Sequence, residues 1–80
     1  MKAIAEISLY PLKDSFIPPI DAFIEALNKY DSLEVSTNAL STMIKGEYDV
    51  LMEKLTKEIK LHFEGGIPSV FVLKIHAIAE

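Results

Sequence analysis

The sequence contains no cysteine. Disulfide bonds and thiolate metal ligands are therefore excluded. The two histidines, His62 and His76, lie far apart, and neither sits in an HExxH or similar spacing. A lone histidine is a poor metal ligand, and His76, close to the end of the chain, is expected simply to be exposed. The sequence thus predicts no metal site and no cofactor.

Positive charge is also scarce. Eight Lys and Arg residues stand against twelve Asp and Glu residues, which gives a net charge of −4. Nucleic-acid-binding proteins draw most of their affinity from a clustered basic face. The composition therefore argues against a nucleic-acid partner and slightly favours a cationic ligand.

Long hydrophobic runs are missing as well. Lys2 and Glu6 flank the only apolar stretch near the N-terminus. Neither a signal peptide nor a membrane span can be recognised. We therefore expect a cytoplasmic protein with no membrane partner.

Motifs of enzyme active sites are sparse. The sequence has no nucleophile elbow and no phosphate-binding glycine loop, and Gly65 and Gly66 follow a predicted helix rather than open one. A binding module is therefore favoured over an enzyme, and no catalytic residue is predicted.

Apolar residues, in contrast, make up half of the chain. Eighty residues suit one domain, predicted over residues 1–80. Small domains often gain stability by oligomerisation, so part of this apolar surface could face another copy of the chain.

The periodicity of these apolar residues predicts six elements. Two-residue alternation predicts strands, and steps of three and four residues predict helices. Pro18 and Pro19 suit the first turn of a helix, whereas Pro11 is expected to end strand pairing. Asn38, which tolerates a left-handed backbone, would help a short hairpin link at 38–40. The predicted order is strand 3–9, a helix from Pro18, strands 33–38 and 41–45, helix 46–63 and strand 69–77.

This βαββαβ order predicts an α+β fold of the ferredoxin-like type. Right-handed crossovers would give an antiparallel sheet in the order 4-1-3-2, with both helices on one face. The helices would cover the apolar strand faces, which carry Ala5, Ile7, Leu9, Val35, Ile44, Phe71, Leu73 and Ile75.

The opposite face of the predicted sheet is mixed in character. It could meet another sheet in a homo-oligomer or bind a small ligand, and the two are compatible. We call it the open face, and it carries Ile4, Glu6, Ser8, Tyr10, Glu34, Ser36, Asn38, Ser41, Met43, Lys45, Val70, Val72, Lys74 and His76.

Glu6 on the open face has two interpretations. It is either solvated or paired across strands with Lys45 or Lys74, or it is partly buried and faces a cationic ligand. Both remain open on the sequence alone.

Three short motifs, "ISLYPL", "DSFI" and "STMIKG", occur in this order along the chain. Together they resemble the YkoF-like thiamine- or hydroxymethylpyrimidine-binding domain, within the broader thiamine-binding (UPF0045) superfamily. The resemblance implies a ferredoxin-like fold, association through sheets into dimers or tetramers, and reversible binding of thiamine or its pyrimidine moiety without chemistry. YkoF-like proteins carry two such domains in one chain, so a homodimer could supply the second copy here.

The resemblance also implies ligand contacts on these motifs. Serine, threonine and asparagine match the donors and acceptors of an aminopyrimidine, an aromatic ring could stack on it, and an acidic residue could lie near the positive thiazolium. Tyr10 could instead pack at a rim, and Ser41 and Thr42 could simply suit a hairpin. The candidate ligand-binding residues are Glu6, Ser8, Tyr10, Asp14, Ser15, Phe16, Asn38, Ser41 and Thr42.

These observations together predict a homo-oligomeric, cytoplasmic protein that binds thiamine or its hydroxymethylpyrimidine moiety without catalysis. The alternative is a protein-interaction or regulatory module of the same fold with no small-molecule ligand. A small enzyme ranks third, since ferredoxin-like domains host many activities.

Overall fold

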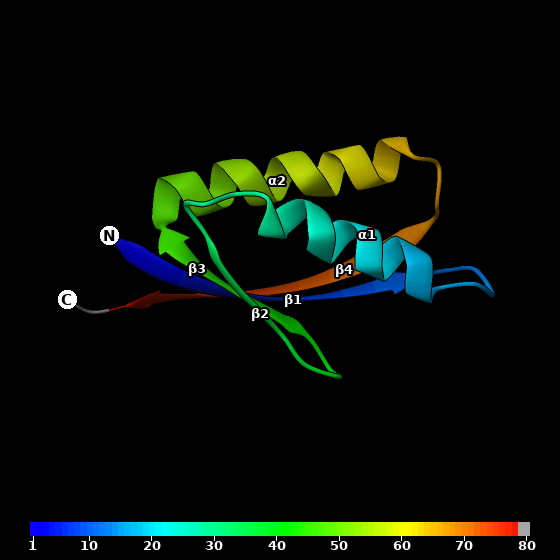
Figure 1. Cartoon of the computed structure of the whole chain (residues 1–80), viewed down its shortest axis with the longest axis horizontal. Helices are drawn as coiled ribbons and strands as arrows, with labels where there is room; N and C mark the ends of the chain where they lie inside the picture. The colour runs from blue at the N-terminus through cyan, green and yellow to red at the C-terminus, as the bar shows by residue number, and fades with distance from the viewer. Residues whose placement is uncertain (79–80) are drawn as a thin grey trace.

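A computed structural model describes residues 1–78 of the chain. Its elements follow the predicted βαββαβ order (Figure 1). They are β1 (Lys2–Pro11), α1 (Ile17–Asn28), β2 (Glu34–Thr37), β3 (Thr42–Glu47), α2 (Tyr48–Glu64) and β4 (Ser69–Ile78).

The four strands form one sheet in the order β2-β3-β1-β4, and every neighbouring pair is antiparallel. This is the predicted 4-1-3-2 order read from the other edge. Both helices lie on the same side of the sheet (Figure 1). The ferredoxin-like α+β fold is therefore confirmed.

The register of the strands also confirms the two predicted faces. Ala5 lies opposite Ile44 on β3 and Ile75 on β4, so these residues share the face under the helices. Glu6 lies opposite Met43 and Lys74 on the open face.

Helix α2 packs on the sheet through an apolar stripe. Leu51 and Leu55, one turn apart, are fully buried together with Leu27 of α1. Tyr30, just after α1, donates a hydrogen bond to the Glu58 carboxylate on α2 at 2.5 Å. The two helices are thus joined to each other as well as to the sheet.

One residue predicted to lie beneath the helices is exposed, and four others, Leu9, Val35, Phe71 and Leu73, are only partly buried. Ile75 keeps 43% of its surface exposed, whereas Ala5 and Ile44 in the same row are fully buried. Strand β4 is an edge strand, and the helix cover ends before it reaches Ile75.

Most predicted boundaries differ from the observed ones by one or two residues, and two of these differences change the role of a residue. Pairing of the first strand was expected to stop at Pro11. Instead Pro11 is itself paired, with Ser69 on β4, and is the last residue of β1. Gly46 belongs to β3, opposite Ala3, and not to the second helix, which begins at Tyr48. An added Cβ on Gly46 would come within 3.0 Å of Leu33 Cδ2, so a glycine here lets the loop before β2 approach the strand.

The ends of the elements depend on particular residues. Pro18 and Pro19 lie in the first turn of α1, where a backbone donor is not needed. Helix α2 ends at Glu64 with Gly65 as its C-cap, and Gly66 then adopts a positive φ of 84°. No helix within residues 1–78 has the length and apolar character needed to span a membrane.

Asn38 shapes the hairpin turn through its side chain as well as through its backbone N–H, which donates to the Ser41 carbonyl oxygen at 3.0 Å. Within the described part of the chain, only a glycine has a positive φ, so Asn38 does not adopt the left-handed conformation that it could tolerate. Instead, its Oδ1 accepts hydrogen bonds from the N–H groups of Leu40 (2.8 Å) and Ser41 (3.0 Å). This side-chain turn reverses the chain between β2 and β3.

Candidate functional site

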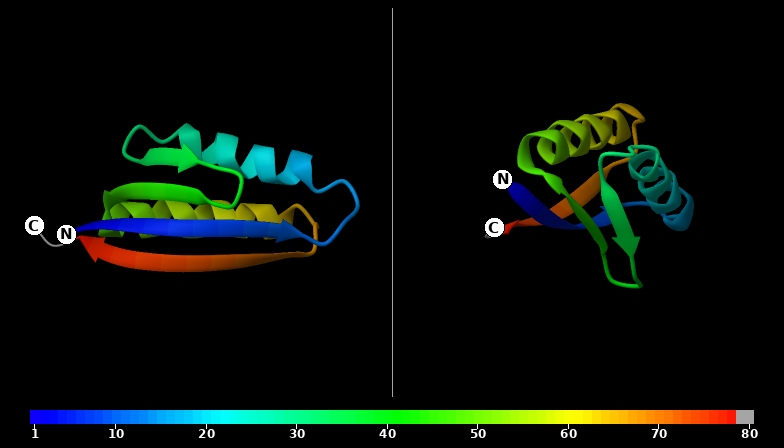
Figure 2. Two further views of the ribbon diagram at one scale, coloured as in Figure 1. Left: turned by 90° about the horizontal axis from the view of Figure 1, so that it is seen from below. Right: turned by 60° about the vertical axis from the view of Figure 1, so that its left-hand side comes forward.

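Strand β1 is longer than the hairpin that flanks it. It pairs with β4 along its whole length to Pro11, but its pairing with β3 stops at Ile7. Beyond that point the β2–β3 loop projects away from the sheet (Figure 2, right). The result is a gap beside the last four residues of β1.

A pocket of about 300 Å³ occupies this gap. Its size is at the lower end of the range for small-molecule sites. We call it the hairpin pocket, since the β2–β3 loop forms one wall and β1 and α1 form the others. It is lined by Ile7, Ser8, Leu9, Tyr10, Pro11, Phe16, Ile20, Phe23, Ile24, Thr37, Asn38, Ala39, Leu40, Ser41 and Thr42.

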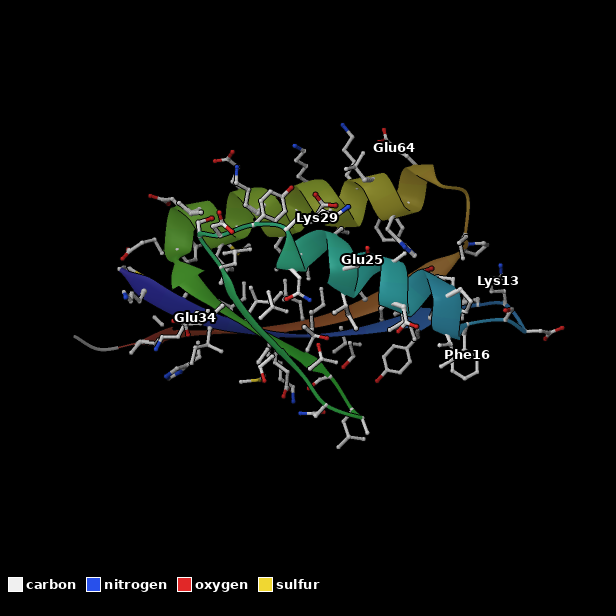
Figure 3. The ribbon with its side chains drawn as sticks, in the orientation of Figure 1. Lys13, Phe16, Glu25, Lys29, Glu34 and Glu64 are labelled. Atoms are coloured by element: carbon white, nitrogen blue, oxygen red, sulfur yellow. The ribbon has the colours of Figure 1, made fainter. Side chains whose placement is uncertain are left out.

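Two aromatic side chains lie at the mouth of the hairpin pocket. Tyr10 is 54% exposed and Phe16 is 49% exposed. Figure 3 shows Phe16 at the start of α1, on the side toward which the hairpin loop projects. Large apolar surfaces left in water beside a pocket are available to cover a flat ligand.

The polar groups of the pocket are partly used by the protein itself. Ser8 Oγ donates to the Leu40 carbonyl oxygen at 3.2 Å, which ties the hairpin loop to β1. The hydroxyls of Thr42, which is buried, and Thr37 lie 3.2 Å apart and satisfy each other. The Asn38 side-chain oxygen is used in the turn. Its Nδ2 donor, the Ser8 lone pairs and the Tyr10 hydroxyl are left for a ligand.

Glu6 lies beside the pocket and not in its wall. Its carboxylate accepts a hydrogen bond from Ser41 Oγ at 3.2 Å and stands 3.7 Å from Lys74 Nζ. The cross-strand pairing with Lys74 considered from the sequence therefore exists. The carboxylate is also one hydrogen bond away from Ser41, which lines the pocket.

The structure brings six of the nine predicted site residues together in the pocket wall. Asp14 and Ser15 lie in the exposed loop between β1 and α1 and do not line it, and Glu6 is the neighbour described above. The six lining residues are Ser8, Tyr10, Phe16, Asn38, Ser41 and Thr42.

A family profile for thiamine-binding proteins matches residues 5–78 of this chain. The chain belongs to the thiamine-binding protein family. No significant match is found among the curated proteins compared with it.

Solved structures show the same fold as this member of the thiamine-binding family. A hypothetical protein from Methanocaldococcus jannascii is 30% identical, with a TM-score of 0.83 over 99% of this chain and 82% of that one. A Streptococcus pneumoniae protein is 23% identical, with a TM-score of 0.88 over 99% and 89% of the two chains. A Thermotoga maritima protein, provisionally assigned to thiamine biosynthesis or salvage, is 18% identical, with a TM-score of 0.86 over 98% and 85%.

Sequence reasoning missed the apolar floor of the pocket in this family member. Ile20, Phe23 and Ile24 of α1 line it, although their spacing marks them only as a core-facing helix stripe. No sequence signal separates them from the core stripe, because the pocket depends on where β1 and β3 end, and apolar periodicity does not resolve these end points.

A second, shallower hollow of about 250 Å³ lies where α1 meets the end of α2. His62 lines it, with Nε2 2.8 Å from Ser69 Oγ. Burial lowers the pKa of His62, because the charged imidazolium is less well solvated there. Phe23 lines both hollows, so its ring separates them. Residues 1–78 hold no group of three or more potential metal ligands.

Proposed function

We propose that this protein binds thiamine, or its hydroxymethylpyrimidine moiety, reversibly in the hairpin pocket and catalyses no reaction. The observation that carries the proposal is the position of the pocket. It lies where the sequence motifs of a thiamine-binding family member meet, with two exposed aromatic rings at its mouth.

The chemistry of the pocket suits an aminopyrimidine. The ring is flat and apolar on its faces, and Tyr10 and Phe16 offer surfaces that can stack on it. Its edge carries nitrogen acceptors and an amino donor, which Asn38 Nδ2 and the Ser8 hydroxyl oxygen match in type.

The positive thiazolium of thiamine would lie toward the Glu6 side of the pocket. Glu6 is the carboxylate hydrogen-bonded to the pocket-lining Ser41, and the Lys74 ammonium that faces it is mostly in water. A partly solvated ion pair of this kind is weak, so the carboxylate remains able to attract a second cation.

We also propose that the open face joins copies of the chain into a dimer or tetramer. Val70 and Val72 are exposed there, and Ile4 and Met43 are only half-buried. An apolar strip on a sheet surface is suited to burial against the same strip of another copy. Light scattering would measure the assembly, and Val72→Lys should lower its mass. A monomeric wild-type protein would overturn this part of the proposal.

Calorimetric titration with thiamine tests the central claim. We expect saturable heat and a thermal stabilisation that grows with ligand concentration, about 2.7 kcal/mol at a hundredfold excess over Kd. Ser8→Ala should weaken binding, whereas Leu12→Ala, in the exposed loop outside the pocket, should not. Absence of both heat and stabilisation at millimolar thiamine would reject the proposal and favour the protein-interaction module.

A further inference from the structure

At the hairpin pocket, the main chain of β1 loses its hydrogen-bonded neighbour β3 and keeps β4. In an antiparallel sheet, the N–H and C=O of one residue point to the same side, and the next residue points to the other. Two hydrogen bonds fix this alternation in β1. The Leu12 N–H donates to the Pro68 carbonyl oxygen at 2.8 Å, on the β4 side, and the Tyr48 N–H donates to the Met1 carbonyl oxygen at 2.8 Å, on the β3 side.

Even-numbered residues of β1 therefore bond toward β4, and odd-numbered residues bond toward β3. Ile7, opposite Thr42, is the last odd residue with a β3 partner. The next is Leu9, beside which the hairpin has already turned away. No hydrogen bond among residues 1–78 joins Leu9 to the hairpin, and the nearby Leu40 carbonyl instead accepts from Ser8 Oγ. Leu9 itself lines the pocket.

Pro11 supports this assignment. It is the following odd residue, so its missing N–H would also face the pocket side of β1. Proline is tolerated in a strand only where no ladder donor is required. Its pairing with Ser69 on the other side is intact.

We infer that the main-chain N–H and C=O of Leu9 are the polar recognition element of the hairpin pocket. They form a donor and an acceptor on one residue, and they fit a ligand edge on which a ring nitrogen acceptor stands next to an amino donor, as in a 4-aminopyrimidine. The ligand would continue the antiparallel bonding pattern where β3 leaves it. This inference rests on the proposed function and deepens it by naming the ligand edge that is read.

The neighbouring side chains favour this orientation. A ring held in the plane of the sheet beside Leu9 would have Ser8 and Tyr10 on its open-face side. On the other side it would meet the apolar residues of α1, among them Phe23 and Ile24. The hydroxyl protons of Ser8 and Ser41 are already donated within the protein, to Leu40 and Glu6. A main-chain N–H is thus the donor that an incoming ring nitrogen finds unused at the strand edge, and an unpaired amide beside a partly buried side chain gains from a partner.

Amide hydrogen exchange measured by NMR on the full chain tests the inference without any substitution. In the free protein, the Leu9 amide should exchange at least about tenfold faster than the Ile7 amide, which bonds to β3. Saturating thiamine should slow Leu9 by about tenfold or more beyond any slowing that the general stabilisation of the fold gives Ile7 and Ser8. A Leu9 amide that is already protected, or that thiamine does not protect, would overturn the inference.

Ligand analogues and a pair of variants give a second test. Thiamine with hydrogen in place of its 4-amino group should bind about tenfold more weakly, since one hydrogen bond is lost. Leu9→Pro removes the N–H that faces the pocket and keeps the pairing with β4. It should lose more affinity than Leu9→Ala, which keeps that N–H. Equal binding of both ligands would reject the inference, whether or not Leu9→Pro folds.

The two proposals fail in different ways. If thiamine gives neither heat nor stabilisation, the proposed function itself falls. If thiamine binds while Leu9 exchange and the preference for the amino group are unaffected, the function stands and only the role of Leu9 is lost.

Discussion

The two halves of β1 differ in what surrounds them. From Lys2 to Ile7 the strand lies between β3 and β4, and Ala3 and Ala5 beneath the helices are fully buried. From Ser8 to Pro11 it keeps only β4, and Tyr10 at its end is more than half exposed. One continuous strand is thus core at one end and pocket wall at the other.

This difference shows that the hairpin pocket forms because β1 lacks a neighbouring strand beside its last four residues. We call Lys2–Ile7 and the residues that pack against it the closed half, and Ser8–Pro11 and the other residues of the hairpin pocket the open half. Both edges of β1 are paired in the closed half, which fixes the position of the backbone. The open half continues the same strand, so its backbone is held in place by the closed half. Its edge toward β3 is unpaired and lies beside the hairpin pocket. Binding sites are precise when their groups sit on rigid elements, and here the rigidity comes from the closed half.

The largest effect is expected in the closed half. Ile44, opposite Ala5, has no exposed surface. Ile44→Ala should lower the free energy of unfolding by about 2–5 kcal/mol, because it removes buried methyl groups and leaves a cavity. Denaturant unfolding would measure it. Leu40→Ala, on the 86% exposed loop tip of the open half, should change stability by less than about 0.5 kcal/mol. Similar losses in both variants would break the comparison.

Gly46 should give the next largest effect. An added Cβ would lie 3.0 Å from Leu33 Cδ2 and 3.2 Å from the Ser32 carbonyl oxygen. Gly46→Ala should therefore cost about 1–3 kcal/mol of stability through overpacking. Lys45→Ala, at the adjacent exposed position of β3, is the matched control in the same unfolding experiment. A stable Gly46→Ala protein would mean that the loop before β2 yields easily.

In the open half, binding and stability should separate. Phe16→Ala removes an exposed ring at the pocket mouth, so thiamine affinity should fall by about fivefold, equivalent to about 1 kcal/mol of aromatic contact. The unfolding free energy should change by less than about 0.5 kcal/mol. Titration calorimetry and denaturant unfolding of the same sample test both. Unchanged affinity would remove Phe16 from the site.

Asn38 offers a finer separation of the two roles. Asn38→Asp keeps the Oδ1 acceptor of the turn and removes only the Nδ2 donor. It should preserve stability and weaken binding of the neutral hydroxymethylpyrimidine by about threefold to fivefold. Asn38→Ala should lose stability as well, because the Leu40 and Ser41 N–H groups lose their acceptor. Equal stability of the two variants would show that the turn does not need this side chain.

The smallest effect is expected from the pH dependence at His62. Burial lowers its pKa in the folded protein, so the unfolded chain binds the proton more tightly. The stability due to neutral His62 should be complete above its ordinary value of 6.5 and decrease as the pH falls through 6.5 toward the lowered value. Unfolding free energies at pH 7 and pH 5 should show a smaller decrease for His62→Gln than for the wild type. Equal decreases would contradict the assignment.

Much of the closed half could be predicted from the sequence. Apolar alternation is a local property, and it assigned Ala5, Ile7 and Ile44 to the helix-covered face correctly. The order of the elements and the handedness of crossovers then determined the sheet order. These predictions hold because shifting the register of a strand by one residue would move all of its apolar side chains from the core to the solvent-exposed face.

The open half could be predicted only in part. The resemblance pointed to Ser8, Tyr10 and Phe16, which line the pocket. The pocket itself depends on β1 reaching Pro11 while β3 starts at Thr42, and periodicity does not resolve such end points. Pro11 misled the prediction, because whether a proline interrupts pairing depends on which side of the strand its missing N–H faces.

Pro11 has a further consequence, which concerns contacts between molecules. An unpaired strand edge invites the strand of another molecule to continue the sheet, which is a route to aggregation. Here a partner strand could bond at Leu9 but would find no donor at Pro11, two residues on. The free edge of β1 therefore offers a second molecule's strand fewer hydrogen bonds than an edge without a proline would, which disfavours strand addition there.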